Sequence, residues 1–353
     1  MKVLNLRRTK SSVVMGPLER YYRILSGEGE ASYLISKRRS VDVDLAQDDA
    51  HLWQMHERVV RGIQKPGSAV SLLDIKIELA KRMMSHCSLC ERRCLVDRAK
   101  GEAGHCRVLS PKICSDFLHM GEEPDLVPSY TIFFSGCTLE CAYCQNWDIS
   151  THPELGAGFE SAAVAKMIEA RACARGGRES QARLSTRARN VNWVGGDPTP
   201  NLPFILETLG YCEANLPQVW NSNMYLSERA MDLLNGIVDL YLTDFKYGND
   251  ACAKRLSNAP DYLRIVRRNH ILAHESAEMI VRHLVLPGHV ECCTRPVLEW
   301  VSKNLEHIKV NVMSQYRPEH RAMQFPEISR PLGMEEFKRA IQIAEDLGVD
   351  LTD

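Results

Sequence analysis

The chain has 353 residues, 44% hydrophobic and 25% charged, so it can bury the core of a barrel-sized domain with an accessory segment. A formal net charge of −1 argues against a basic nucleic-acid-binding surface, and the arginine-rich stretch 175–189 is interpreted as a solvated loop. No run approaches the roughly 18 apolar residues that span a bilayer, and the charged start precedes no apolar signal region. We therefore expect a cytoplasmic protein without nucleic-acid or membrane partners, whose thirteen cysteines bind metal rather than form disulfides.

Residues 1–80 are expected to form a helical N-terminal extension. Residues 1–45 show no sustained periodicity. Apolar residues at helical spacing then predict two amphipathic helices, one on each side of the break at 65–68. These residues are Leu52, Met55, Val59 and Ile63 in the first helix, and Leu72, Ile75, Leu79 and Met83 in the second.

A cysteine-rich segment is expected over residues 81–125. Cys87, Cys90, Cys94 and Cys106 lie within twenty residues, and four thiolates can close a tetrahedral metal site. Zinc, a second iron-sulfur cluster and a single iron remain open, because thiolates suit all three. A structural clip and an electron-transfer or cofactor-supporting role are equally compatible with this pattern.

From residue 126 to 353 we expect one α/β domain, because short apolar runs alternate with helical stretches from residue 130 onward. Strands are predicted at 131–136, 190–195, 218–223, 240–246, 279–286 and 309–314. Helices are predicted among others at 161–174, 203–214, 228–236 and 295–306. Six strands alternating with helices favour an open or partial parallel barrel, in which reactive groups gather where strands end.

The most informative pattern is a cysteine triplet that directly follows the first predicted strand. Cys137, Cys141 and Cys144 have the spacing CxxxCxxC. Three thiolates leave a four-iron cluster one protein ligand short, so one iron stays open to bind a small molecule. The pattern therefore predicts chemistry at iron.

This spacing, with aromatic Tyr143 before the third cysteine, resembles the signature of the radical S-adenosylmethionine (radical SAM) enzymes. The resemblance implies a partial (β/α)6 barrel, a 4Fe-4S cluster, S-adenosylmethionine on the open iron, release of a 5'-deoxyadenosyl radical, and a cofactor-binding role for Tyr143. It is closest to the pyruvate formate-lyase activating enzyme-like (PflX-like) branch. Further segments that carry it are 87–106, 131–134, 144–146, 195–200 and 220–225.

The resemblance also assigns cofactor contacts after the second and third strands. Gly195, Gly196 and Asp197 resemble the family's GGEP motif, with Asp in place of Glu. Ser222 and Asn223 end an apolar strand and offer polar groups to the cofactor, although a helix cap would explain them equally well.

Three charged residues and a histidine complete the predicted site. Asp244 and Lys246 alternate onto one strand face and resemble an Asp-x-Lys pair that holds S-adenosylmethionine in glycyl-radical-enzyme activases; an internal salt bridge is the alternative. Arg282 is expected to clamp a carboxylate. His289 follows a Pro-Gly turn and is expected at the barrel mouth, where it would relay protons or contact substrate. We predict catalytic roles for Asp244, Lys246 and His289.

The predicted function is hydrogen abstraction from a protein or peptide residue, either as an activase or in another post-translational modification. A ferredoxin or flavodoxin would supply the electron. The first alternative is a cobalamin-dependent radical SAM C-methyltransferase acting on a protein such as methyl-coenzyme M reductase, since similar proteins of methanogens have that activity. The second is a metal-stapled binding protein without turnover.

Overall fold

The computed structural model describes residues 16–65, 67–172 and 187–352. Most of the arginine-rich stretch, and the last two residues of the helix predicted at 161–174, lie outside this range. Within it, no helix is long and apolar enough to cross a membrane.

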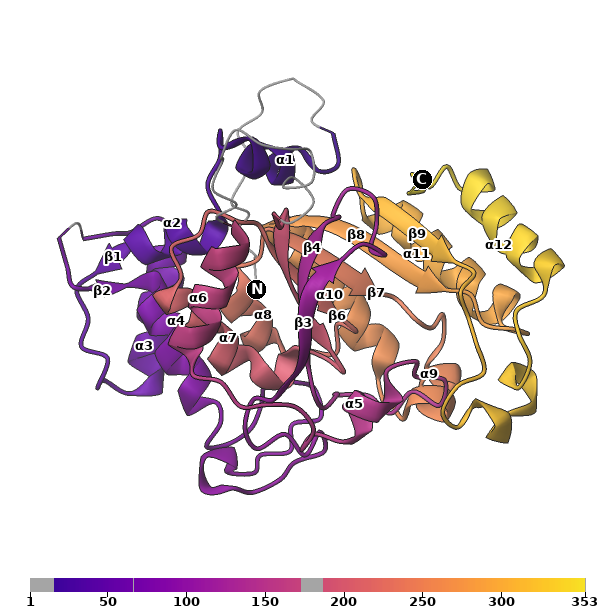
Figure 1. The fold of residues 1–353 in the computed structure, drawn as a ribbon, viewed down its shortest axis with the longest axis horizontal. Coiled ribbons are helices and arrows are strands. Elements are labelled where there is room, and N and C mark those ends of the chain that lie inside the picture. The colour runs from indigo at the N-terminus through magenta and orange to yellow at the C-terminus, as the bar shows by residue number, and fades with distance from the viewer. Residues whose placement is uncertain (1–15, 66, 173–186, 353) are drawn as a thin grey trace.

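A seven-stranded sheet forms the centre of the molecule (Figure 1). Its strands lie side by side in chain order: β3 Ile113–His119, β4 Ser129–Phe134, β5 Asn190–Gly195, β6 Gln218–Ser222, β7 Leu240–Asp244, β8 Glu278–Leu284 and β9 Lys309–Met313. β4 to β9 are parallel, and β3 pairs antiparallel with β4. The six parallel strands are the six predicted from the sequence, so the α/β partial-barrel fold is confirmed.

Helices lie between the parallel strands along the chain, and one more helix follows the last strand. Those between the strands are α5 Trp147–Thr151, α6 Ser161–Ala172, α7 Leu202–Tyr211, α8 Glu228–Leu234, α9 Asp250–Ser257, α10 Tyr262–Ser276 and α11 Arg295–Asn304, and the last is α12 Met334–Asp346. All except α5 have buried residues. A π-helical turn, η4 Val290–Thr294, precedes α11. The core includes fully buried Trp193 and Trp220 on two central strands.

β3 was not predicted, because its sequence mixes apolar residues with polar Ser115 and Asp116 and only one of its faces is covered. It is an edge strand. Apart from a bridge between Ile113 and Ala157, β3 pairs only with β4 among the described residues.

The N-terminal region contains α1 Glu19–Ser26, α2 Ser32–Arg38, β1 Ser40–Val41, α3 Asp49–Val60, β2 Val70–Ser71 and α4 Leu72–Arg82. The two predicted helices are α3 and α4; α1 and α2 were not predicted. Ser71 caps α4 through a capping box with Asp74. Ile63, expected on the apolar face of the first helix, is exposed because α3 ends at Val60.

Helices α3 and α4 lie beside α7 at one end of the molecule (Figure 1). Leu52 on α3 and Leu79 on α4 are fully buried and belong to the same hydrophobic core as the sheet. The division into segments 1–80, 81–125 and 126–353 stays a prediction.

Candidate functional site

The triplet cysteines lie in the loop between β4 and α5, beyond the carboxyl end of the first parallel strand. Backbone hydrogen bonds hold this loop against the end of α9: Glu140 N–H donates to Ser257 O (3.1 Å) and Ala142 N–H to Leu256 O (2.7 Å). Gly136, which precedes Cys137, has a φ of +80°, a conformation that favours glycine. These hydrogen bonds and the glycine conformation define the path of the loop.

Each triplet sulfur has a hydrogen-bond donor near it. Asn223 Nδ2 lies 3.6 Å from Cys137 Sγ, Ser257 Oγ 3.0 Å from Cys141 Sγ and Ser150 Oγ 3.4 Å from Cys144 Sγ. Burial raises the pKa of Cys137 well above its usual value, and the nearby Asp197 carboxylate adds to this rise. Donors aimed at sulfur suit thiolates that bind metal, because metal binding removes the thiol protons.

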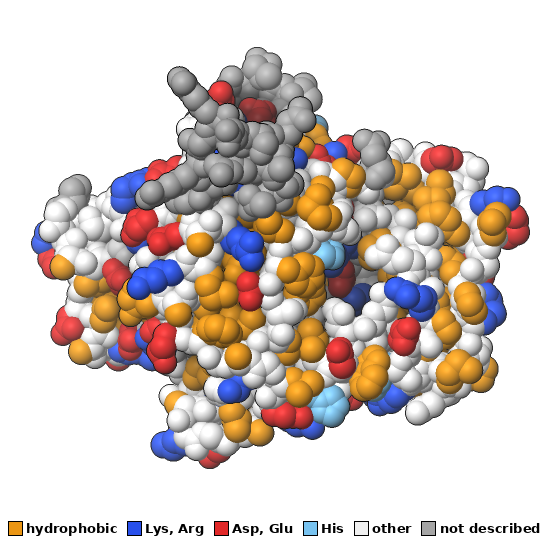
Figure 2. Space-filling model, viewed as in Figure 1, with side chains coloured by type: hydrophobic (Ala, Val, Ile, Leu, Met, Phe, Trp, Pro, Cys, Tyr) orange, Lys and Arg blue, Asp and Glu red, His pale blue; other side chains and the backbone are white. Residues whose placement is uncertain are grey.

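The three thiols line one cavity of about 380 Å³ at the carboxyl ends of the strands. Its wall also contains every predicted cofactor-binding residue: Tyr143, Gly195, Gly196, Asp197, Ser222, Asn223, Asp244, Lys246 and Arg282. Figure 2 shows a hollow in this face of the molecule with acidic and basic side chains in its depth. Residues spread over about 150 positions in the sequence thus meet in one place.

The Gly195-Gly196-Asp197 turn packs directly onto the cysteine loop. Gly195 has a φ of +129°, and a Cβ there would lie 2.0 Å from Phe134 O. A Cβ on Gly196 would lie 2.1 Å from Gly136 O. The two glycines are therefore required for the close approach of this turn to the backbone around Cys137.

Asp197 is buried, and its carboxylate joins the ends of β5 and β6. It accepts hydrogen bonds from Thr199 N–H (2.9 Å), Ser222 Oγ (3.0 Å) and Asn223 N–H (3.0 Å). Burial raises its pKa, although these hydrogen bonds act in the opposite direction. The carboxylate thus fixes Ser222 and Asn223 in position. The Asn223 side chain also donates to Thr138 Oγ1 (3.0 Å) in the cysteine loop.

An ion network lies in the same cavity. Lys246 Nζ lies 2.7 Å from Asp244 Oδ2, and Arg282 lies 3.1 Å from Asp244 Oδ1 and 2.6 Å from Asn221 Oδ1. Burial alone would raise the pKa of Asp244, but Lys246 and Arg282 lower it to about 2. Burial would lower the pKa of Lys246, and the Asp244 carboxylate outweighs that effect and raises it. Both groups therefore carry their charges at neutral pH.

Two titratable residues of the cavity, Glu122 and His119, were not predicted from the sequence. Glu122 accepts hydrogen bonds from Asn192 Nδ2 (3.0 Å) and Arg282 (3.4 Å), and His119 Nδ1 lies 3.3 Å from the same carboxylate. Both come from the end of β3 and the turn after it. No sequence motif marks them, because only the antiparallel pairing of β3 with β4 brings them to this cavity.

His289 does not line the cavity, so the expectation that it reaches the barrel mouth beside the substrate is not met. Its side chain lies instead beside Cys252 of α9 and Cys292 and Cys293 of η4. The ligand atoms of these four residues all lie within 4.8 Å of one another. His289, Cys292 and Cys293 lie within five positions of the sequence, but the fourth member, Cys252, is 37 positions before His289, so the sequence did not reveal the group.

The cysteine-rich segment also lies at this end of the barrel. Cys90 pairs with Leu226 in an isolated bridge, and Arg92 Nε donates to Thr138 O in the cysteine loop (2.8 Å). Burial raises the pKa of Cys90, and Cys106, Cys87 and Cys94 add to the rise. The metal at this segment stays a prediction.

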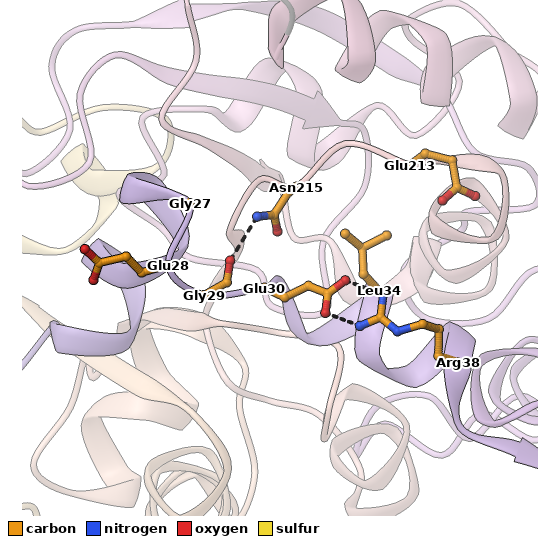
Figure 3. A pocket seen from close by; sticks show the side chains of 8 residues that line it. All are labelled: Gly27, Glu28, Gly29, Glu30, Leu34, Arg38, Glu213 and Asn215. Atoms are coloured by element: carbon orange, nitrogen blue, oxygen red, sulfur yellow. Dashed lines mark hydrogen bonds and ion pairs between the residues drawn. The ribbon is translucent and has the colours of Figure 1, made fainter.

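A second hollow of about 570 Å³ lies far from these cysteines, between α1, α2 and the loop after α7 (Figure 3). Arg38 pairs with Glu30 in its wall, and Asn215 Nδ2 donates to Gly29 O (3.0 Å). Its wall contains no cysteine or histidine. It offers no chemistry comparable with that of the cavity at the triplet.

Comparison with known proteins agrees with this site. Residues 131–301 match the Radical SAM superfamily. The chain is 42% identical over 352 residues to the uncharacterized protein MJ0674 of Methanocaldococcus jannaschii, covering 95% of this chain and 98% of that protein. The chain belongs to the radical SAM superfamily. Membership implies a 4Fe-4S cluster and S-adenosylmethionine.

Two solved structures illustrate the range of similar proteins. A domain of pyruvate-formate lyase-activating enzyme from Bacteroides vulgatus is 16% identical with a TM-score of 0.38, covering 46% of this chain and 97% of that one. Streptococcus suis SuiB bound to precursor peptide SuiA is 10% identical with a TM-score of 0.43, covering 61% and 46%.

The residues present fit the implied group. The three thiols, each with a hydrogen-bond donor nearby, would hold the cluster. Among the described residues, the three triplet sulfurs do not all lie within 4.8 Å of one another. The wider spacing suits a multi-iron cluster, whose thiolates bind different iron atoms. Asp244, Lys246 and Asn223 offer charges and an amide to the polar cofactor beside it.

Proposed function

We propose that this radical SAM enzyme binds S-adenosylmethionine beside Cys137, Cys141 and Cys144 and abstracts hydrogen from a protein or peptide residue. The observation that carries the proposal is the presence of the three thiols and the Asp244-Lys246 pair in one cavity. When bound, the cluster and cofactor supply one-electron reductive cleavage that yields a hydrogen-abstracting radical. The chain's own residues bind and orient these groups.

Charge complementarity assigns the roles of the ion network. S-adenosylmethionine carries a carboxylate and an ammonium group close together. Lys246 offers a cation to the carboxylate, and Asp244 offers an anion to the ammonium or sulfonium. Arg282 and Glu122 extend the alternation of charges, so no ion in the network is left uncompensated.

Asp197 has a positioning role in this proposal. Its two oxygens already accept three hydrogen bonds within the chain, from residues 199, 222 and 223. It keeps the Asn223 amide beside Cys137 instead of contacting the cofactor itself.

The edge strand β3 supports a peptide-like substrate. His119 and Gly121, at its end, line the cavity. The free edge presents unpaired backbone groups, to which an extended peptide can add as a further strand. Exposed Phe117 and Met120 beside this edge provide apolar contacts for such a peptide.

The electron must come from outside the cavity, and we infer a ferredoxin or flavodoxin as its donor. An activase-like reaction and another peptide modification share the same first step. They differ in the modified protein that they produce, and mass spectrometry of substrate proteins distinguishes the two products. Cobalamin-dependent methylation would require cobalamin in addition.

The first experiment measures 5'-deoxyadenosine after anaerobic reconstitution of the full chain with iron and sulfide, reduction, and addition of S-adenosylmethionine. We expect turnover in the wild type and in Cys114→Ser, a cysteine outside the cavity. Cys141→Ser should show none. Absence of product from a fully loaded wild-type protein would overturn the proposal in favour of a binding protein without turnover.

The second experiment compares the proteins of a deletion strain and its parent by mass spectrometry. Cleavage at a glycine after exposure to air would indicate an activase. A mass increase of one methyl group, with cobalamin bound to the purified enzyme, would indicate the methyltransferase.

A further inference from the structure

Four potential metal ligands converge outside the catalytic cavity. His289 Nδ1 lies 3.3 Å from Cys292 Sγ, 3.6 Å from Cys252 Sγ and 4.0 Å from Cys293 Sγ. The two adjacent cysteines have their sulfurs 4.0 Å apart. Within the described parts of the chain, these residues form the one group of three or more such ligands within 4.8 Å.

These distances are those of the edges of a small tetrahedron. A tetrahedral Zn²⁺ binds sulfur at about 2.3 Å and imidazole nitrogen at about 2.0 Å. It therefore separates two sulfurs by about 3.8 Å, and sulfur from nitrogen by about 3.5 Å. The four ligand atoms surround a space of the right size for one ion, and a multi-iron cluster would need them further apart.

We propose that Cys252, His289, Cys292 and Cys293 bind a single tetrahedral Zn²⁺ ion. Three thiolates and one imidazole form a closed ligand set without an open position, which is typical of structural zinc. The ion would join α9, which carries Cys252, to the π-helical turn η4, which carries the two adjacent cysteines.

The surrounding residues hold this ligand set in place. The π-helical turn brings two consecutive cysteines toward the same histidine, and such turns are frequent at functional sites. Asn249 Nδ2 donates to Cys292 O (2.9 Å) and lies 3.7 Å from Cys293 Sγ. A Cβ on Gly248 would lie 2.7 Å from Cys293 O, so only glycine permits this approach of the β7–α9 loop. Cys292 is exposed, which gives an ion a route to the site.

Two other interpretations explain the cluster less well. Cysteines that merely fill a core would not gather three sulfurs around one imidazole nitrogen, with one of the cysteines exposed to solvent. A disulfide needs sulfurs about 2.05 Å apart, and the adjacent pair is separated by 4.0 Å. The imidazole would bind through Nδ1, which leaves its proton on Nε2.

The zinc would position the cysteine loop of the radical site. Cys252 lies in the first turn of α9, and Ser257 at the other end donates to Cys141 Sγ (3.0 Å). Leu256 and Ser257 also accept backbone hydrogen bonds from that loop. Fixing one end of this short helix therefore fixes the other, about 7.5 Å along its axis. This effect on the loop rests on the proposed function, whereas zinc binding does not.

Zinc content tests the proposal directly. The full chain, produced with added zinc, is analysed for zinc and iron by mass spectrometry. Cys252→Ser and His289→Ala should each lose one molar equivalent of zinc relative to wild type. Cys114→Ser, which removes a cysteine from β3, should lose none, and His289→Cys should keep the ion because it supplies a fourth thiolate.

Equal zinc in wild type and both loss variants would overturn the proposal. One equivalent of iron in place of zinc would overturn the choice of metal, and a disulfide linking Cys252 to Cys292 or Cys293 would overturn the site. Failure of S-adenosylmethionine cleavage in a protein that keeps this zinc would count against the proposed function alone.

The rate of thiol modification in the wild-type protein tests for zinc even if the variants fold poorly. Iodoacetamide should modify Cys292 slowly in the zinc-loaded protein and at least tenfold faster after chelation. Cys114 serves as the internal control and should react at the same rate in both. Equal rates at Cys292 before and after chelation would exclude zinc at this thiol.

Discussion

The cysteine triplet and the Cys252-His289-Cys292-Cys293 group lie at opposite ends of α9 and differ in how their ligand atoms are arranged. The triplet sulfurs line a cavity, and each has a donor from the chain near it. In the second group the ligand atoms lie within 4.8 Å of one another and face inward. An open, incomplete ligand set suits chemistry, whereas a compact and complete set suits structure.

The largest expected effect is on the rate of S-adenosylmethionine cleavage, which should fall much further when a triplet cysteine is replaced than when Cys252 is replaced. Cys141→Ser should reduce S-adenosylmethionine cleavage by roughly a factor of 100 or more, because the cluster loses a ligand. Cys252→Ser should reduce it roughly tenfold, as is typical when a supporting residue is lost. Rates of 5'-deoxyadenosine formation measure both. Equal losses would contradict the difference in role.

The ion network should contribute to the affinity for S-adenosylmethionine. Asp244→Asn leaves Lys246 without its anion in a poorly solvated site, while Arg282 keeps Glu122, so we expect the Kd to rise roughly 10- to 100-fold. Isothermal titration of the reconstituted protein measures this. Glu335→Gln breaks an exposed pair with Lys338 and should leave the Kd unchanged.

The contact between the glycine turn and the cysteine loop should stabilise the fold. Gly195→Ala places a Cβ 2.0 Å from Phe134 O at a φ of +129°, and should lower the free energy of unfolding by about 2 to 4 kcal/mol. Denaturant unfolding of the metal-free protein measures it. Gly16→Ala, where a Cβ meets nothing within 4 Å, should change it by less than about 0.5 kcal/mol.

The hydroxyl that links α9 to the triplet should tune the cluster. Ser257→Ala removes a donor 3.0 Å from Cys141 Sγ, and a hydrogen bond to sulfur stabilises the more negative, reduced state. A loss of about 1 kcal/mol lowers the one-electron potential by about 40 mV. A redox titration followed by electron paramagnetic resonance should show this shift, and Ser302→Ala on α11 should show none.

The smallest effect concerns pH. The pKa of Asp244 is about 2 in the folded chain, below its usual value of 3.8, because Lys246 and Arg282 outweigh the effect of burial. Its contribution to stability is therefore complete above about pH 4 and is lost as the pH falls toward 2. Unfolding of the metal-free protein should show a smaller loss between pH 4 and pH 2 in Asp244→Asn than in the wild type, because the other paired carboxylates, such as Glu336, remain in both.

Much of the barrel was predictable, because its strands are short apolar runs with clear boundaries. The predicted strand 190–195 matches β5 Asn190–Gly195 at both ends. Strand β3 was not predictable in the same way, since Asp116 and Ser115 interrupt its apolar pattern on a half-covered edge. Glu122 and His119 were missed with it, although they contact the ion network and the cavity.

Residues near each other in the sequence could be assigned to a site from spacing alone. Cys137, Cys141 and Cys144 share one loop, so the distances between them are limited by at most seven residues of chain. The placement of His289 depends instead on where α9 and η4 meet in space. Its neighbours in the structure are 37 positions away at Cys252 and three or four at Cys292 and Cys293.

The sequence by itself determined the alternation of strands and helices and the three-thiol loop after the first parallel strand. Both are encoded in residues close together along the chain. Tertiary structure alone decided that Glu122 and His119 join Asp244, Lys246 and Arg282 in the cavity of those thiols, and that Cys252 meets His289. Parallel strands bring their carboxyl ends to one edge of the sheet, and that packing sets distances that the linear order of residues does not contain.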